Sequence, residues 1–194
     1  MDSLKFADIG NTVKLQYTKG LFRIVEWADL VTVHVLPGEC IVQGLEQAAQ
    51  SINEPRGCLL IAQMSSKGAF TDNDDYVKGV VECAKKYSDF VIGFISQSRV
   101  VECAKKYSDF VIGFISQSRL TTTDKFLHCT PGVHLNNTGD QLGQQYVTPR
   151  QAIDERGADI LIVGRAILDS INRAKTAEEY QQQGYQAYEE IRKI

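Results

Sequence analysis

The sequence predicts an α/β fold built on a parallel sheet, open or closed, and three observations carry that prediction. Short apolar runs rich in β-branched residues alternate with segments of helical character along the 194 residues. The apolar runs are continuous rather than alternating with polar residues, as expected for parallel strands that are buried on both faces. Polar residues gather where the apolar runs end, and in closed parallel sheets the working residues collect at those strand ends.

The predicted elements follow one another as strand and helix. A short stub at residues 4–7 precedes the longer apolar runs. Thr176 and Glu179 predict a capping box at the start of the last helix. The predicted strands are Asp29–Leu36, Gly57–Met64, Phe90–Ser96, Phe110–Ser116, Phe126–Thr130 and Asp159–Val163, and the predicted helices are Ile41–Ile52, Asp75–Lys86, Pro149–Arg156 and Thr176–Ile191.

Length and composition predict one soluble domain spanning residues 1–194. The net charge of -3 argues against a nucleic-acid partner. The apolar runs are too short to span a bilayer, and the N-terminus lacks a signal-peptide pattern, so we expect no membrane partner. The five cysteines form no Cys-x-x-Cys motif. Cys58 and Cys129 lie in apolar runs, which predicts buried free thiols and a reducing, cytoplasmic compartment.

The histidines predict no metal site. His34 and His128 lie inside predicted strands and are expected to be satisfied core residues, whereas His134 begins a long polar loop that ends at Thr148. No pair of histidines has the spacing of metal ligands. We therefore expect no metal.

A perfect tandem repeat interrupts the pattern. Val80–Arg99 and Val100–Arg119 have the same sequence, and each copy predicts one helix followed by one strand. Two identical units then compete for one place in the sheet. Either the extra strand inserts and shifts the strand order, or one copy is displaced and exposes its apolar residues. For the second copy these are Phe110, Val111, Ile112, Phe114 and Ile115.

Five short motifs carry the functional prediction. Residues 5–12 read Lys-Phe-Ala-Asp-Ile-Gly-Asn-Thr, in which Lys5 and Asp8 form a charged pair that can hold and deliver a proton. On its own, such a pair is more often a surface ion pair. The other motifs are Met64-Ser65-Ser66, Thr130-Pro131-Gly132, Leu142-Gly143-Gln144-Gln145-Tyr146 and Val163-Gly164-Arg165.

Together these motifs resemble the orotidine 5'-phosphate decarboxylase family, including the carboxy-terminal domain of animal UMP synthase. The resemblance implies a TIM (β/α)8 barrel and the conversion of orotidine 5'-monophosphate to UMP without a cofactor. It also implies a homodimer that binds a small-molecule nucleotide. With the stub and one repeat copy we count six strands where a barrel has eight. The predicted fold is therefore barrel-derived, incomplete at its N-terminus, with one helix–strand unit duplicated.

The resemblance implies a role for each motif residue. Lys5 would protonate the carbon that carbon dioxide leaves, and Asp8 would be its electrostatic partner. Asp8, Ile9 and Thr12 would reach into the neighbouring subunit's pocket. Ser65 alone would more often be a turn residue, and an arginine such as Arg165 often caps a strand end. By resemblance, Ser65 would bind the pyrimidine, Pro131 would line the base pocket, and Gln144, Tyr146, Gly164 and Arg165 would hold the phosphate.

The sequence departs from the family pattern at one position beside Lys5. The family carries an aspartate two residues before this lysine, where this chain has Ser3. Since charged groups that act as a unit lose most of their effect together, we expect near-background catalysis from this chain alone. The alternatives are a non-catalytic nucleotide binder, a splice or gene-model fragment, and a phosphosugar decarboxylase of the same superfamily.

Overall fold

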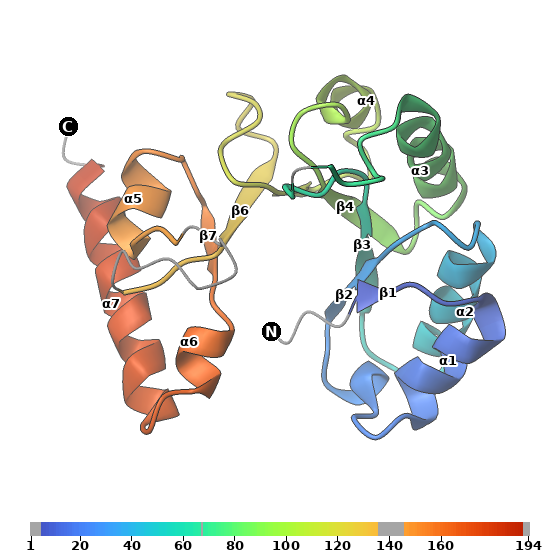
Figure 1. Cartoon of the computed structure of the whole chain (residues 1–194), viewed down its shortest axis with the longest axis horizontal. Coiled ribbons are helices and arrows are strands. Elements are labelled where there is room, and N and C mark those ends of the chain that lie inside the picture. Colours follow the sequence, from blue (N-terminus) through green and yellow to red (C-terminus); the bar gives the residue numbers. More distant parts are fainter. Residues whose placement is uncertain (1–4, 67, 136–145, 192–194) are drawn as a thin grey trace. The chain divides into compact units, whose positions relative to one another are not determined.

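The chain divides into two compact units in the computed structural model. The structure describes residues 5–66, 68–135 and 146–191. The amino-terminal unit comprises Ser3–Phe114, and the carboxy-terminal unit comprises Ile115–Ile194 with Met1–Asp2. Figure 1 shows the elements of both units in sequence colours, and we describe each unit by itself.

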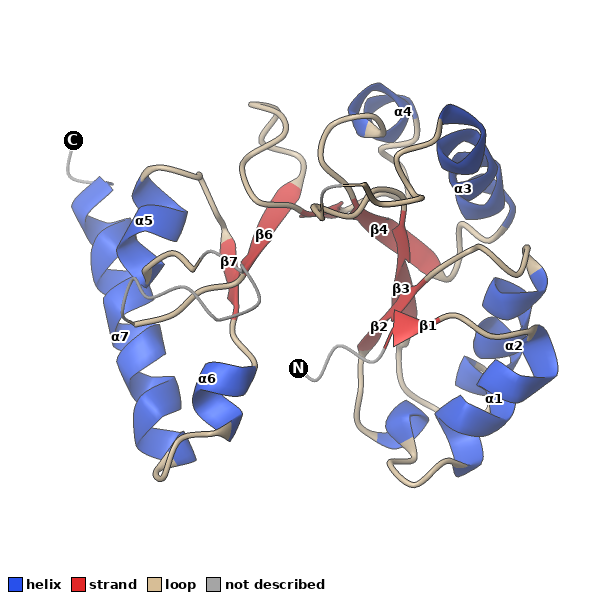
Figure 2. Cartoon of the chain, viewed as in Figure 1, coloured by secondary structure: helices blue, strands red, loops and turns tan. Residues whose placement is uncertain are grey.

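The amino-terminal unit alternates strands and helices. Its strands pair in parallel and in sequence order, β1 with β2, β2 with β3 and β3 with β4, and Figure 2 shows the helices between them. Sequence-ordered parallel strands are the pattern of a (β/α) barrel. The strands are β1 (Lys5–Phe6), β2 (Leu30–Val33), β3 (Gly57–Ile61) and β4 (Val91–Ile95), and the helices are α1 (Gly10–Lys19), η1 (Ile24–Glu26), α2 (Cys40–Ala49), α3 (Asp74–Lys86) and α4 (Val101–Lys106).

One face of this sheet is a continuous apolar row. Phe6, Val33, Leu60 and Phe94 are register partners across β1 to β4, and each is at most 4% exposed. Phe6 packs edge-on against Tyr17 of α1 at a centroid distance of 5.6 Å, so the row faces the helical layer. Because strand side chains alternate, Lys5 and its partners point the other way.

Two glycines bring helices α1 and α2 into close contact. A methyl group at Gly44 would lie 2.5 Å from the carbonyl oxygen of Gly10, and one at Gly10 would lie 2.7 Å from that of Cys40. Only a residue without Cβ permits this approach of two backbones. The helices that follow β1 and β2 are thereby locked together.

Both copies of the repeat fold as a helix followed by a strand, so the extra strand inserts rather than being displaced. The strand of the second copy is β5 (Gly113–Ile115), which crosses the division between the units. The amide of Ile112 donates to the carbonyl of Ile92 at 2.9 Å, so equivalent residues of the two copies are neighbours. Val111 and Phe114 are buried, whereas Ile112 is 49% exposed.

The carboxy-terminal unit pairs β6 in parallel with β7. A buried cluster of Val133, Val147, Ala152, Ala158 and Tyr180 holds its helices against these strands. The elements are β6 (Leu127–Pro131), α5 (Pro149–Asp154), β7 (Ile160–Ile162), α6 (Arg165–Leu168) and α7 (Arg173–Ile191).

The predicted α/β class is confirmed, and the element boundaries need correction. Most strands are shorter than predicted, because the ends of several apolar runs lie in the loops, whereas β6 has the predicted length and is shifted by one residue. The capping box predicted at Thr176 is wrong: α7 begins at Arg173, and the side chain of Asn172 accepts from the amide of Lys175 at 3.1 Å. A capping box is present at α5 instead, between Thr148 and Gln151. Helices α1 and α6 were not predicted, whereas α4 is the helix expected of the second repeat copy.

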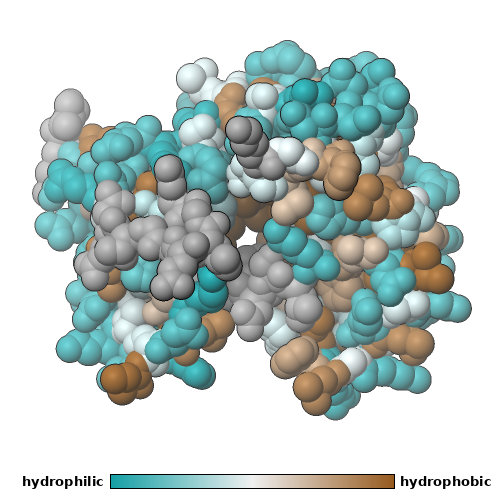
Figure 3. Space-filling model, in the orientation of Figure 1, coloured by the Kyte–Doolittle hydropathy of each residue, from teal (hydrophilic) through white to brown (hydrophobic). Residues whose placement is uncertain are grey.

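The face of the molecule drawn in Figure 3 is mainly polar. Figure 3 shows hydrophilic residues over most of the visible face, with apolar side chains scattered among them. Leu21, Phe70 and Ile171 are nearly fully exposed at 92%, 95% and 107%. Among the described residues, no helix is both long and apolar enough to cross a membrane.

Candidate functional site

The predicted catalytic lysine lies on the face of the sheet opposite the helical layer. Lys5 belongs to β1, is exposed, and is the register partner of Thr32. Thr32 is in turn the partner of Leu59. The side chain of Lys5 therefore projects from the concave side expected of a barrel, where a ligand could meet it.

Asp8 does not pair with Lys5 within the described part of the chain. One of its carboxylate oxygens accepts a hydrogen bond from the amide of Ile9 at 2.7 Å, and no ion pair joins it to Lys5 there. The prediction of a compact charged pair is therefore wrong. The two side chains are separated by a bend after β1, because Asp8 lies between the strand and helix α1.

Ile9 is the residue before helix α1, and Thr12 lies in the first turn of that helix. Ile9 precedes the first residue of α1 and is 59% exposed, whereas Thr12 is half-buried. An exposed isoleucine at a helix start is free to meet another surface. The proposed contribution of these residues to a neighbouring subunit stays a prediction.

His34 lies beside Lys5, which the sequence did not indicate. Its amide donates to the carbonyl of Phe6 at 2.9 Å, extending the pairing of β2 with β1. The ring is half-buried, and its Nδ1 atom has no hydrogen-bond partner in the described residues. Burial lowers the pKa of His34, and the charge of Lys5 lowers it further. The prediction of a satisfied core residue is wrong for His34, whereas His128 is buried as predicted.

The proposed pyrimidine ligand Ser65 lies on the loop after β3, in the same unit as Lys5. Its side chain is exposed. The loop is tied internally, because the amide of Met64 donates to the hydroxyl of buried Thr71 at 3.0 Å. Gln63, which sequence reasoning missed, is also buried there. In the sequence, Gln63 stands out only because it is a polar residue at the end of an apolar run.

The predicted phosphate residues Tyr146, Gly164 and Arg165 lie in the carboxy-terminal unit, as does Pro131, which is predicted to line the base pocket. Pro131 ends β6 and is the register partner of Ile162, while Gly164 and Arg165 follow β7. The carboxyl ends of parallel neighbours lie at the same edge of a sheet. Gly132, directly after Pro131, has φ 74, a conformation that glycine adopts without strain.

Arg165 and Tyr146, both predicted to hold the phosphate, contact each other. One terminal nitrogen of the Arg165 guanidinium donates to the Tyr146 hydroxyl at 3.3 Å, and the ring of His134 lies 5.3 Å from that of Tyr146. The base of this loop is closed by a bridge between Val133 and Val147. Gln144 lies outside the described residues.

The loop is anchored to the core of its unit. The amide of His134 donates to Val147 at 2.8 Å, and the amide of Leu135 donates to the Tyr180 hydroxyl at 3.1 Å. Both ends of the loop are therefore fixed next to Tyr146. The arrangement presents a planar cation and a phenol at a strand end, a combination suited to phosphate oxygens.

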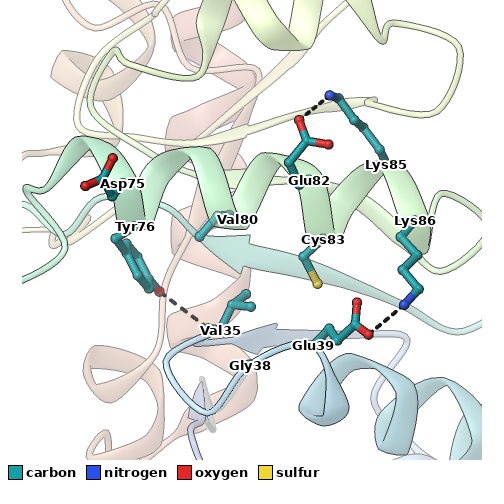
Figure 4. A pocket seen from close by; sticks show the side chains of 11 residues that line it. Val35, Gly38, Glu39, Asp75, Tyr76, Val80, Glu82, Cys83, Lys85 and Lys86 are labelled. Atoms are coloured by element: carbon teal, nitrogen blue, oxygen red, sulfur yellow. Dashed lines mark hydrogen bonds and ion pairs between the residues drawn. The ribbon is translucent and has the colours of Figure 1, made fainter.

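A separate cleft of about 750 Å³ lies between α3 and the loop after β2 and contains none of the predicted site residues. Figure 4 shows the ion pair of Lys86 with Glu39, at 2.6 Å, and Tyr76, whose hydroxyl accepts from the amide of Val35 at 3.4 Å. Glu82 pairs with Lys85. Because these charges neutralise one another, we assign the cleft no ligand. Among the described residues, no group of three His, Cys, Asp or Glu side chains could hold a metal ion.

Comparisons with known proteins agree with these motifs. A family model described as orotidine 5'-phosphate decarboxylase / HUMPS family matches residues 3–180. The chain is 45% identical over 184 residues to uridine 5'-monophosphate synthase of Bos taurus, covering 95% of this chain and 34% of that protein. It is 44% identical to the orotidine 5'-phosphate decarboxylase of Torulaspora delbrueckii and 45% identical to that of Candida glabrata, covering 95% of this chain and 64% and 63% of those proteins. The chain thus spans less than two thirds of each of these relatives.

Proposed function

Because the chain belongs to the orotidine 5'-phosphate decarboxylase / HUMPS family, we propose that it acts on orotidine 5'-monophosphate and converts it to UMP and carbon dioxide. The names of its relatives support this substrate over a phosphosugar. The structural observation that carries the proposal is the contact of Arg165 with Tyr146 at a strand end. A guanidinium group and a phenol hydroxyl placed together in this way are expected to bind a phosphate group.

The proposal gives each predicted site residue a role. Lys5 is the proton donor, with Asp8 as an electrostatic partner that acts across a subunit boundary together with Ile9 and Thr12. This assignment is consistent with the exposure of Ile9 and the lack of a Lys5–Asp8 ion pair in the described chain. Ser65 would bind the base. Pro131 would line the base pocket, and Gln144, Tyr146, Gly164 and Arg165 would bind the phosphate.

We further propose a homodimer in the cytoplasm. The dimer follows from the assignment of Asp8 to the neighbouring pocket. The cytoplasm fits the five cysteines, which are free in the structure. Cys58 is buried, and burial raises its pKa well above the ordinary value, which keeps the thiol protonated and unreactive. Cys129 is only half-buried, less than its apolar run predicted.

A second candidate is a nucleotide-binding protein without turnover. Two observations favour it: Ser3 stands where the family carries an aspartate, and the carboxylate of Asp8 is held by the amide of Ile9. The phosphate residues are unaffected by either. This candidate predicts UMP binding with no release of carbon dioxide.

Carbon dioxide release from carboxyl-labelled orotidine 5'-monophosphate separates the two candidates. We expect the parent chain to bind UMP and to turn over near background, and Ser3→Asp to raise turnover by at least about tenfold. Lys5→Ala in that background should abolish the gain. If the parent chain turned over on the order of 10 substrate molecules per second, the expected loss of catalytic activity would be contradicted. UMP binding with no gain from Ser3→Asp would favour the second candidate, and no binding by the parent would contradict both.

A further inference from the structure

Gln63 is the centre of a buried hydrogen-bond cluster that joins β3 to β4. It lies just beyond the last residue of β3 and is 5% exposed. Its Oε1 atom accepts from the Ser96 hydroxyl at 2.9 Å. The same oxygen accepts from the amides of Gln97, Ser98 and Arg99 at 3.3, 3.1 and 3.0 Å.

The glutamine oxygen is the acceptor in all of these hydrogen bonds. Three consecutive amides that converge on one point form a concave nest that favours an electron-rich atom. If the side-chain amide of Gln63 were flipped, its NH2 group would face the backbone N–H donors. The side-chain oxygen must therefore face the nest. The position therefore selects for an acceptor.

The tandem repeat provides an internal comparison. The second copy carries the same residues at 116–119, but there the Ser116 hydroxyl donates to the carbonyl of Ser118. The amide of Arg119 donates to the carbonyl of Arg156 at 2.7 Å instead of to a side chain. Since the two segments are identical in sequence, their different hydrogen bonds come from their surroundings. For the first copy the distinguishing group is Gln63.

A second tie joins the same two loops. Arg99, whose amide contacts Gln63, forms ion pairs through its guanidinium with Asp72, at 2.9 Å, and with Asp74. Ser65 lies on the loop after β3, between Gln63 and Asp72, which each contact the loop after β4. The loop after β3 and the loop after β4 are thus joined at both ends of the segment that carries Ser65.

We propose that Gln63 is a positioning residue, which fixes the loops after β3 and β4 so that Ser65 is presented to the base of the nucleotide. The presentation of Ser65 rests on the proposed function, whereas the fixing of the loops does not. We expect a carboxylate at position 63 to keep these hydrogen bonds, because every partner of the Oε1 atom is a donor. A side chain of similar length without an acceptor would leave buried donors unpaired.

Hydrogen exchange tests the positioning role without any ligand. In Gln63→Met, the amides of residues 97–99 should exchange at least about tenfold faster, while Gln63→Glu should keep their protection. Ser116→Ala serves as the matched control, since it removes the equivalent hydroxyl of the other copy and should leave residues 97–99 unchanged. Because internal peptides of the copies have equal mass, the peptides must span the Arg99–Val100 or Arg119–Leu120 junction.

Ligand binding tests the presentation of Ser65. Gln63→Met should weaken UMP binding by about tenfold and leave inorganic phosphate binding unchanged, and Gln63→Glu should bind UMP within about twofold of the parent. Unchanged exchange in Gln63→Met, or equal damage from Met and Glu, would overturn the positioning role. Faster exchange with unchanged UMP affinity would overturn the link to Ser65. A parent that binds no UMP would contradict the proposed function, and with it the link to Ser65, while exchange would still decide the role of Gln63 in the loops.

Discussion

Burial lowers the pKa of His34, and the ammonium group of Lys5, on the adjacent strand, lowers it further. The histidine is therefore held neutral at pH 7, next to the residue proposed to deliver a proton. Its buried Nδ1 atom has no hydrogen-bond partner in the described part of the chain. A neutral imidazole at this point adds no second positive charge beside Lys5.

Removing the charge of Lys5 should raise the pKa of His34. We expect Lys5→Met to shift the titration of the His34 ring upward, because one of its two lowering causes is gone. NMR titration of the ring protons measures this shift. Lys14→Met is the control, since Lys14 contacts Gln47 on α2 and should leave His34 unchanged. An unchanged titration in Lys5→Met would show that burial alone sets the pKa.

The chain should lose stability as the pH falls below about 6.5, the ordinary histidine value. Burial lowers the pKa of both His34 and His128, with the charge of Arg119 adding to the effect at His128. The unfolded chain then binds more protons than the folded one below that pH, so the free energy of unfolding decreases. Urea midpoints at pH 7.5 and 5.5 measure the loss. His128→Gln should reduce the difference between the midpoints, and equal midpoints in the parent would refute the argument.

UMP binding should depend on Arg165 more than on Lys5. Charge-assisted hydrogen bonds are worth about 1.5–3 kcal/mol, so Arg165→Ala should weaken binding by roughly tenfold to a hundredfold. Calorimetric titration of UMP into the Arg165→Ala and Lys5→Ala variants gives the comparison. Tyr146→Phe, which removes the hydroxyl that Arg165 contacts, should cause a smaller loss. Equal losses for the lysine and arginine variants would count against the phosphate assignment.

Gly44→Ala should destabilise the amino-terminal unit. Its new methyl group would lie 2.5 Å from the carbonyl oxygen of Gly10 and would force α1 and α2 apart. We expect a loss of about 1–3 kcal/mol, the range for overpacked sites. Gly79→Ala in α3 is the matched control: nothing lies within 4 Å of its added Cβ, so a gain of up to about 1 kcal/mol is expected from helix propensity. Thermal unfolding of both variants decides the matter, and a stable Gly44→Ala protein would mean that the helices can separate without cost.

Deleting Val100–Arg119 should leave a folded and more compact chain. The deletion joins Arg99 to Leu120, so the same four residues still precede the segment that leads to β6. The helix of the second copy is the shorter one, since α4 has 6 residues whereas α3 has 13 and begins at Asp74, before the first copy starts. In the parent we therefore expect faster amide exchange in α4 than in the equivalent residues of α3. Size-exclusion chromatography tests the deletion, and an aggregated variant would show that the second copy is integral to the fold.

The strand–helix order was predictable because buried parallel strands leave a continuous apolar signature. Helix α1 was missed because its sequence, starting at Gly10, is polar and is amphipathic only weakly, with Val13 and Tyr17 as its buried residues. The Gln63 cluster could not be predicted, since it depends on how two loops meet. The repeat makes the reason plain: Ser96 and Ser116 have the same neighbours in sequence but form different hydrogen bonds.

The pairing of Ile92 with Ile112 has a consequence for how this chain can change in length. The two copies lie side by side with equivalent residues adjacent, and Gly93 meets the backbone of Gly113. The gain or loss of one copy therefore adds or removes a whole strand. The side chains of the flanking strands keep their orientation toward the core or away from it. An insertion of an odd number of residues within a strand would turn the buried side chains that follow it to the other face of the sheet. We therefore expect this region to accept the gain or loss of a whole helix–strand unit more readily than a change of register within a strand.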